Sequence, residues 1–258
     1  MAGRNPQKGE DAVAKIRAAV PTADVVFEKL DLGSLSSVEA FGAKLRLRYE
    51  ALDLLINNAG VMTPPKRQET SDGFELQLGT NHLGHFALTG HLMPLLRKGA
   101  SPRVVTVSSI AARGAAINFD DLNSRRNYRP MPAYGQSKLA CLMFAMELQR
   151  RSDAFDWGVA SLAAHPELLH NGGGRGGPAS LFRSLFPFLF QPSAQGALPT
   201  LFAATSPDAR SAQYYGPDGV SEIRGFPTLA VIPGPALDKN AARRLWEVSE
   251  QLTGVRYG

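Results

Sequence analysis

Tyr134 and Lys138 are the two side chains whose types and spacing most clearly permit chemistry. They lie four residues apart in a stretch typical of a helix, so one helical face carries both a phenol and an ammonium. Lowering the pKa of a phenol from about 10 to about 7 takes roughly 4 kcal/mol. One positive charge at about 4 Å supplies roughly that much at an effective dielectric constant of about 20. The pair therefore predicts a tyrosine that exchanges protons at neutral pH.

The same pair has a structural interpretation, in which the tyrosine is a half-buried packing residue and the lysine is its solvated neighbour. Further polar positions favour the chemical interpretation. Asn81 lies in the segment Thr80–Phe86, and Ser109 closes the apolar stretch Val104–Val107. In this order Asn81, Ser109, Tyr134 and Lys138 resemble the signature of the short-chain dehydrogenase/reductase family, and the resemblance runs over the whole chain.

The resemblance implies a role for each of four side chains. Tyr134 would be the general acid or base at the substrate oxygen, and Lys138 would lower its pKa and hold the nicotinamide ribose. Ser109 would hydrogen-bond the substrate carbonyl, and Asn81 would anchor a water for proton relay. Ser109 is preferred to Ser108 because the family usually places the second serine of the pair in the site.

Two other segments resemble the retinol-dehydrogenase-like bacterial branch of the family. One is the long connection from Arg113 to Pro130, and the other is the C-terminal part with Gln195–Pro199 and Tyr214–Gly219. Gly, Pro and Asp in these segments also suit ordinary turns in any fold. The resemblance implies an α/β fold with a doubly wound, Rossmann-like parallel sheet.

The cofactor expected from the resemblance is NADP(H) in preference to NAD(H). Arg4 follows the family's second strand, where a basic residue pairs with the 2′-phosphate of NADP, although an exposed arginine needs no such role. Asp31 and Leu32 resemble the adenine-contacting position, but an Asp there also suits a turn. The remaining expected cofactor contacts are Asn58, Ala59 and Gly60 at the adenosine ribose, together with Tyr134 and Lys138. For Asn58–Gly60 the alternative is an ordinary turn between a strand and a helix.

The Gly-rich turn that holds the cofactor pyrophosphate in this family is absent from the sequence. Met1–Pro6 aligns with the end of the family's second strand, so a βα unit of about 30 residues is missing upstream. A central strand contributes several buried side chains, and each stabilises the fold by roughly 1.5–3 kcal/mol. The whole free energy of unfolding of a domain is only about 5–15 kcal/mol, so the loss of this strand would remove much of the stability. We therefore expect residues 1–258 to be one N-terminally truncated Rossmann-like domain that folds poorly by itself.

The segment after the expected strand at 159–164 departs from the family. Glu167 stands where the family has Gly, and Asn171 where it has Thr. His165 and His170 lack a carboxylate at helical spacing, so no metal site is expected. Four Phe within Leu181–Phe190 suggest a lipophilic pocket or lid, with a core-packing helix as the alternative.

Composition limits the class of protein. The chain has 258 residues, 44% of them hydrophobic, which suits one α/β domain. A net charge of +5 with scattered Arg pairs gives no support to nucleic-acid binding. Cys141 is the only cysteine and is expected in the core. The polar N-terminus lacks a secretory signal and no apolar run approaches the ~20 residues of a membrane span, so a cytoplasmic protein is expected.

The elements expected from periodicity alternate between helix and strand. Ser36 and Glu39 fit a capping box for a helix ending near Tyr49. The expected helices are 6–20, 36–49, 72–97, 131–151, 194–204 and 238–252, and the expected strands are 24–30, 52–56, 103–107 and 159–164. Apolar Leu139, Leu142, Met143 and Met146 suit either a core or the interface of a homo-oligomer.

Two functions follow from the sequence. The first is an oxidoreductase that transfers a hydride between NADP(H) and the carbonyl or alcohol of a lipophilic small molecule. Carbon–carbon double-bond reduction is a further possibility with the same residues. The second is a non-catalytic remnant or interaction protein that has lost dinucleotide binding.

Overall fold

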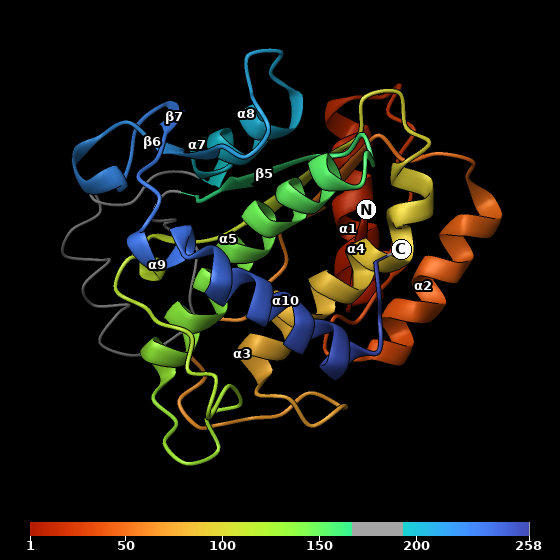
Figure 1. The fold of residues 1–258 in the computed structure, drawn as a ribbon. Coiled ribbons are helices and arrows are strands. Elements are labelled where there is room, and N and C mark those ends of the chain that lie inside the picture. The colour runs from red at the N-terminus through yellow and green to blue at the C-terminus, as the bar shows by residue number, and fades with distance from the viewer. Residues whose placement is uncertain (167–192, 258) are drawn as a thin grey trace.

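The computed structural model describes residues 1–166 and 193–257, which form two mostly parallel sheets with helices packed around them (Figure 1). A two-stranded sheet pairs β1 (Ala2–Gly3) with β2 (Glu28–Lys29). A five-stranded sheet has the order β3-β4-β5-β6-β7. Its strands are β3 (Leu54–Asn57), β4 (Arg103–Val107), β5 (Ala160–Ala164), β6 (Tyr214–Pro217) and β7 (Pro227–Leu229).

The helices alternate with these strands, as a doubly wound sheet requires. They are α1 (Pro6–Ala19), α2 (Leu35–Arg48), α3 (Leu76–Leu78), α4 (Gly84–Leu96), α5 (Pro130–Ala154), α7 (Ser193–Gly196), α8 (Leu198–Thr205), α9 (Gly234–Leu237) and α10 (Lys239–Thr253). Three short turns of other types are the π-helical η1 (Gly79–Leu83) and the 3-10 turns η2 (Ile110–Ala112) and η4 (Val220–Glu222). None of the helices in the described ranges has the length and apolar content needed to cross a bilayer.

The expected parallel α/β architecture is confirmed, and the sheet is covered on both faces. Neighbouring residues of β4 point to opposite sides: Val104 packs with Leu96 and Trp157, whereas Val105 packs with residues of α8. Helices α5 and α10 lie side by side across one face, and α2 packs against α4 (Figure 1). The apolar residues of α5 that allowed an interface, Leu139, Leu142, Met143 and Met146, are buried in the core of this chain.

The sheet differs from a single doubly wound sheet in one respect. Among the described residues, β1 and β2 pair only with each other, and β3 has a ladder partner on one side alone, which is β4. Ile56 of β3 is 37% exposed. The apolar run that contains it predicts a strand that is covered on both faces, so this strand is less buried than expected. The expected strand 24–30 is also shorter, because only Glu28 and Lys29 form the ladder with β1.

Two local expectations are wrong. The capping box at Ser36 and Glu39 does not form, because Ser34 is the N-cap of α2 and its hydroxyl accepts from the Ser37 amide at 3.3 Å. The segment at 72–97 is not one regular helix, because η1 widens the turn between α3 and α4. The strands β6 and β7 were not expected; β7 pairs antiparallel with β6.

Candidate active site

Ser109 and Tyr134 are brought together beside the carboxyl end of β4. Ser109 follows β4 by two residues and caps η2, where its hydroxyl accepts from the Ala111 amide at 3.2 Å. Tyr134 lies in the second turn of α5 and is partly buried, and its hydroxyl lies close enough to the Ser109 side chain for that side chain to influence the pKa of the phenol. The two groups expected at a substrate oxygen therefore face the same point.

Ser108 has a different environment from Ser109. Its side chain is buried, and its hydroxyl donates to the Lys138 carbonyl at 2.7 Å. Ser108 thus joins the end of β4 to α5, and it leaves the position beside Tyr134 to Ser109.

Lys138 lies one turn after Tyr134 with its ammonium almost completely enclosed. The side chain is 5% exposed, and Nζ donates to the Val107 carbonyl at 2.9 Å. The loop after β3 approaches it closely, since a Cβ built on Gly60 would lie 3.6 Å from Nζ. An ammonium has three donors, so two remain for a bound molecule in this part of the structure.

Burial decides the protonation of both groups. It raises the pKa of Tyr134 above its ordinary value, against the opposing effect of the Ser109 side chain. It also lowers the pKa of Lys138. The expectation that Lys138 brings the pKa of Tyr134 to about 7 is wrong for this arrangement, because burial of the phenol dominates and the ammonium is directed to Val107. Tyr134 is therefore protonated at neutral pH and suited to donate a proton.

Asn81 is fully buried and fixes the loop after β3 against α5. Its Oδ1 accepts from the Val61 amide at 2.8 Å, and its Nδ2 donates to the Val61 carbonyl at 3.0 Å and to Ser137 Oγ at 2.9 Å. Ser137 in turn donates to the Tyr134 carbonyl at 2.8 Å. Asn81 thus positions the site, and its expected role in holding a relay water stays a prediction.

The backbone around Asn81 is a π-helical turn, η1, which the sequence did not indicate. The Asn81 carbonyl accepts from His85 Nδ1 at 2.9 Å and from Cys141 Sγ at 3.0 Å. Single π-helical turns inside helices occur frequently at functional sites. Ser137 was also missed, and its only sequence signal is its place between Tyr134 and Lys138 on one helix.

The expected cofactor residues lie at or near the carboxyl ends of β1, β2 and β3. Arg4 is exposed after β1, and Asn58–Gly60 is exposed after β3. Asp31 follows β2 and makes a turn, because its Oδ1 accepts from the Gly33 amide at 3.0 Å, while Leu32 is buried in the core. The exposed backbone at Asn58–Gly60 fits the adenosine end of a dinucleotide, and the two remaining Lys138 donors fit its nicotinamide end. A Gly-rich turn for the pyrophosphate is not found among the described residues.

Several expectations fall outside the described residues. Glu167, His170, Asn171 and the Phe-rich run Leu181–Phe190 all lie within 167–192. His165 is described: it is buried, and its Nε2 lies 2.8 Å from Glu222 Oε2. In the part of the chain that the structure describes, no three His, Cys, Asp or Glu side chains gather in a way that would hold a metal ion.

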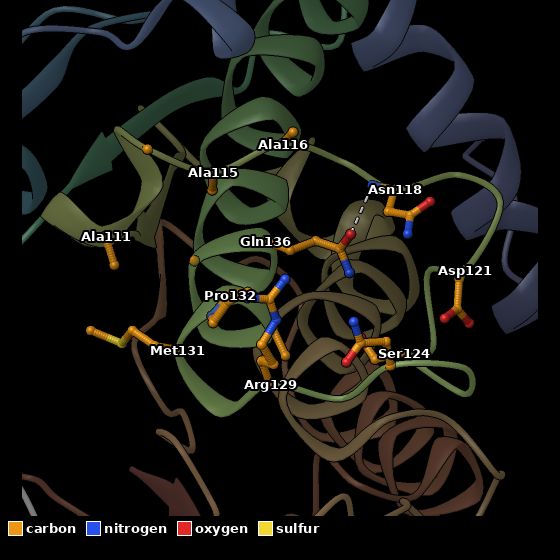
Figure 2. A pocket seen from close by; sticks show the side chains of 14 residues that line it. Ala111, Ala115, Ala116, Asn118, Asp121, Ser124, Arg129, Met131, Pro132 and Gln136 are labelled. Atoms are coloured by element: carbon orange, nitrogen blue, oxygen red, sulfur yellow. Dashed lines mark hydrogen bonds between the residues drawn. The ribbon is translucent and has the colours of Figure 1, made fainter.

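A cavity of about 500 Å³ lies beside the first turns of α5 (Figure 2). Its walls are apolar on one side, with Ala111, Ala115 and Met131, and polar on the other, where Gln136 Oε1 accepts from the Asn118 amide at 2.8 Å. Neither Ser109 nor Tyr134 lines it, so this cavity does not contain the two hydroxyls.

Gly135 holds α5 close to the Ser109 segment, which gives a testable prediction. A Cβ at this position would lie 2.9 Å from the Ala111 carbonyl oxygen and 3.2 Å from Ala115 Cβ. Gly135→Ala should therefore push the helix from η2, separate Tyr134 from Ser109, and lower the free energy of unfolding by about 1–3 kcal/mol. Thermal and urea unfolding measure the loss. Gly114→Ala is the matched control, since a Cβ there meets nothing within 4 Å; equal stability of both variants would contradict this account of Gly135.

Comparison with known proteins agrees with this arrangement. A family model described as short chain dehydrogenase matches residues 1–167. Retinol dehydrogenase 14 of Mus musculus is 37% identical, over 99% of this chain and 78% of the relative, and polyprenol dehydrogenase of Mus musculus is 38% identical, over 100% and 77%. A solved structure of an uncharacterized protein from Mycobacterium paratuberculosis is 39% identical with a TM-score of 0.80, over 100% of this chain and 84% of that one. The chain belongs to the short-chain dehydrogenase family, and it is an oxidoreductase of a family that uses nicotinamide dinucleotide cofactors.

Proposed function

We propose that this enzyme transfers a hydride between NADP(H) and the carbonyl or alcohol of a lipophilic small molecule. The observation that carries the proposal is that the Ser109 and Tyr134 side chains lie next to each other, with Lys138 one helical turn after Tyr134. Reduction of an aldehyde, followed by the loss of NADPH absorbance, tests it directly. Turnover that needs Ser109 supports the proposal, and turnover unchanged in Ser109→Ala would contradict it.

The two hydroxyls act on the substrate oxygen. Ser109 donates a hydrogen bond that strengthens as negative charge develops on that oxygen, and Tyr134 then supplies the proton. The raised pKa of Tyr134 keeps this proton in place at neutral pH, which is the protonation state that carbonyl reduction requires. When bound, the reduced nicotinamide supplies the hydride.

Lys138 and the loop after β3 would hold the cofactor. The two Lys138 donors that the Val107 carbonyl leaves free suit the hydroxyls of a ribose. The exposed backbone of Asn58–Gly60 suits the adenosine ribose, because Gly60 lies beside both Lys138 and Asn81. Asp31 and Leu32 would lie near the adenine, with the Asp31 turn fixing the end of β2.

The preference for NADP(H) rests on Arg4, which is exposed at the carboxyl end of β1. A guanidinium suits the 2′-phosphate that distinguishes NADPH from NADH. We expect Arg4→Ser to raise the KM for NADPH about tenfold, the equivalent of about 1.4 kcal/mol, and to leave the KM for NADH unchanged. Steady-state kinetics with both cofactors measure the ratio. Exposed Arg97→Ser is the control, and an equal change for both cofactors in Arg4→Ser would remove Arg4 from the 2′-phosphate site.

The lipophilic class of substrate is supported by the relatives, which include dehydrogenases of retinol and of polyprenol. We expect kcat/KM to rise with the chain length of aliphatic aldehydes, since each buried methylene contributes about 0.8 kcal/mol. A flat series from butanal to decanal would contradict the lipophilic assignment.

The second candidate is a protein that keeps these residues but does not bind the dinucleotide. Two observations favour it: the described residues supply no Gly-rich turn, and β1 and β3 lie in separate sheets. A thermal shift with NADPH separates the candidates. A rise in Tm supports the enzyme, whereas a folded sample with an unchanged Tm at millimolar NADPH supports the interaction protein.

A further inference from the structure

Glu222 joins three segments at the carboxyl edge of the five-stranded sheet. Its Oε2 pairs with Arg113 at 2.5 Å and lies 2.8 Å from His165 Nε2, while its Oε1 accepts from the Val231 amide at 3.1 Å. The Glu222 side chain is 14% exposed, so these contacts are largely shielded from water. One carboxylate therefore meets the segment after β4, the end of β5 and the segment after β7.

Arg113 links Glu222 to the segment that carries Ser109. It directly follows η2, the turn that Ser109 caps, and its amide donates to the Ile110 carbonyl at 3.1 Å. The guanidinium also donates to the Ser221 carbonyl at 3.3 Å. Both ends of η2 are thus fixed: Ser109 caps its beginning, and Arg113 at its end is held by the loop that carries Glu222.

His165 links Glu222 to β5 and β6. Its ring is fully buried and packs against Tyr214 and over Gly216, where an added Cβ would lie 2.1 Å from Nε2. Burial lowers the pKa of His165. Burial raises the pKa of Glu222, but the Val231 amide, His165 and Arg113 together bring the pKa of Glu222 below its ordinary value. A carboxylate only accepts hydrogen bonds. The neutral imidazole therefore carries its proton on Nε2, and the Nε2–H group donates a hydrogen bond to Glu222.

The backbone supports the same conclusion. Ser221 and Glu222 both have a left-handed conformation, with φ of 57° and 56°. Side chains other than glycine adopt this region at a cost, and the surrounding contacts must maintain it. The ion pair, the imidazole and the Val231 amide supply those contacts at Glu222.

We infer that Glu222 is a positioning residue for the reaction, which fixes the Ser109 turn by holding Arg113 against His165 at the end of β5. This inference rests on the proposed function for its kinetic consequences. Ser109 stabilises charge that is present only in the transition state, so a displaced Ser109 lowers kcat more than it changes KM.

The test is a double-mutant cycle at the ion pair. Glu222→Gln keeps an oxygen for His165 but loses the charge that pairs with Arg113. We expect Glu222→Gln and Arg113→Met each to lower kcat about threefold, and the double variant to lower it by clearly less than the roughly ninefold product, because the ion pair is lost in all three variants. Glu222→Ala also loses the bond to His165 and should lower kcat about tenfold with the substrate KM within twofold.

Glu147→Ala is the matched control, since Glu147 is a buried carboxylate that pairs with two arginines, Arg150 and Arg151, away from the site. The Glu147→Ala variant should have a lower free energy of unfolding and an unchanged kcat. Multiplicative effects of Glu222→Gln and Arg113→Met, or a folded Glu222→Ala with the kcat of the natural chain, would overturn the inference.

A second measurement does not depend on turnover. Amide hydrogen exchange at residues 109–115 should become about tenfold faster in Glu222→Ala and stay unchanged in Glu147→Ala. If the natural chain reduces no carbonyl compound, the proposed function fails while this measurement still decides the inference. Unchanged exchange at 109–115 in folded Glu222→Ala would overturn it.

Discussion

Tyr134→Phe should lower kcat for carbonyl reduction about 10³-fold and leave the fold intact. The substitution removes only the hydroxyl that lies beside the Ser109 side chain, and the ring keeps its place in the second turn of α5. Without the phenol, the developing alkoxide loses the group that we propose as its proton donor. The measurement is kcat with NADPH and a long-chain aldehyde, together with thermal unfolding of both proteins.

Tyr128→Phe is the matched control for this prediction. The Tyr128 ring is also partly buried, and its hydroxyl donates to the Pro64 carbonyl at 2.8 Å, but it lies in the connection before α5. Its loss should change kcat less than about twofold. A folded Tyr134→Phe with more than a tenth of the natural kcat would remove Tyr134 from the role of proton donor.

Lys138→Met should lower kcat about 10²-fold while maintaining or raising stability. Lys138 is 5% exposed and burial depresses the pKa of its ammonium, so the charged form is disfavoured in the folded protein. Because the folded pKa lies below the ordinary value of 10.5, the unfolded chain binds more protons between those two values. This group therefore makes the free energy of unfolding rise with pH in that window, and Lys138→Met should abolish the rise.

Urea unfolding between pH 7 and the alkaline limit of the protein measures the stability part, and steady-state kinetics measure the activity part. Exposed Lys98→Met is the control and should change neither kcat nor the pH dependence. A Lys138→Met variant that retains kcat, or one that unfolds at pH 7, would show that the ammonium serves packing and not the reaction.

Elements with strong local signals were predictable from the sequence. β4 has the expected bounds 103–107, and α1 and α5 begin at prolines that suit a first helical turn. The doubly wound architecture and the meeting of Ser109 with Tyr134 followed from the family resemblance, and the structure brings those two groups together.

Features that depend on contacts distant in sequence were not predictable. β7 is three residues long and becomes a strand only because β6 offers it an edge. The η1 turn has no local signature, since its Asn81 carbonyl accepts from side chains of α4 and α5. The protonation of Tyr134 depends on how much protein covers the phenol, which spacing on a helix does not reveal. Glu222 and His165 are 57 residues apart and meet only through the order of the strands.

The most direct test of the account follows an isotope through the Ser109–Tyr134 site. NADPH with deuterium at both C4 positions of the reduced ring is mixed with a long-chain aldehyde, and the alcohol is analysed by mass spectrometry. The account predicts one deuterium on the carbinol carbon with the natural chain, and about 10³-fold slower formation of that alcohol with Tyr134→Phe. Alcohol without deuterium, or labelled alcohol formed equally fast by Tyr134→Phe, would contradict it.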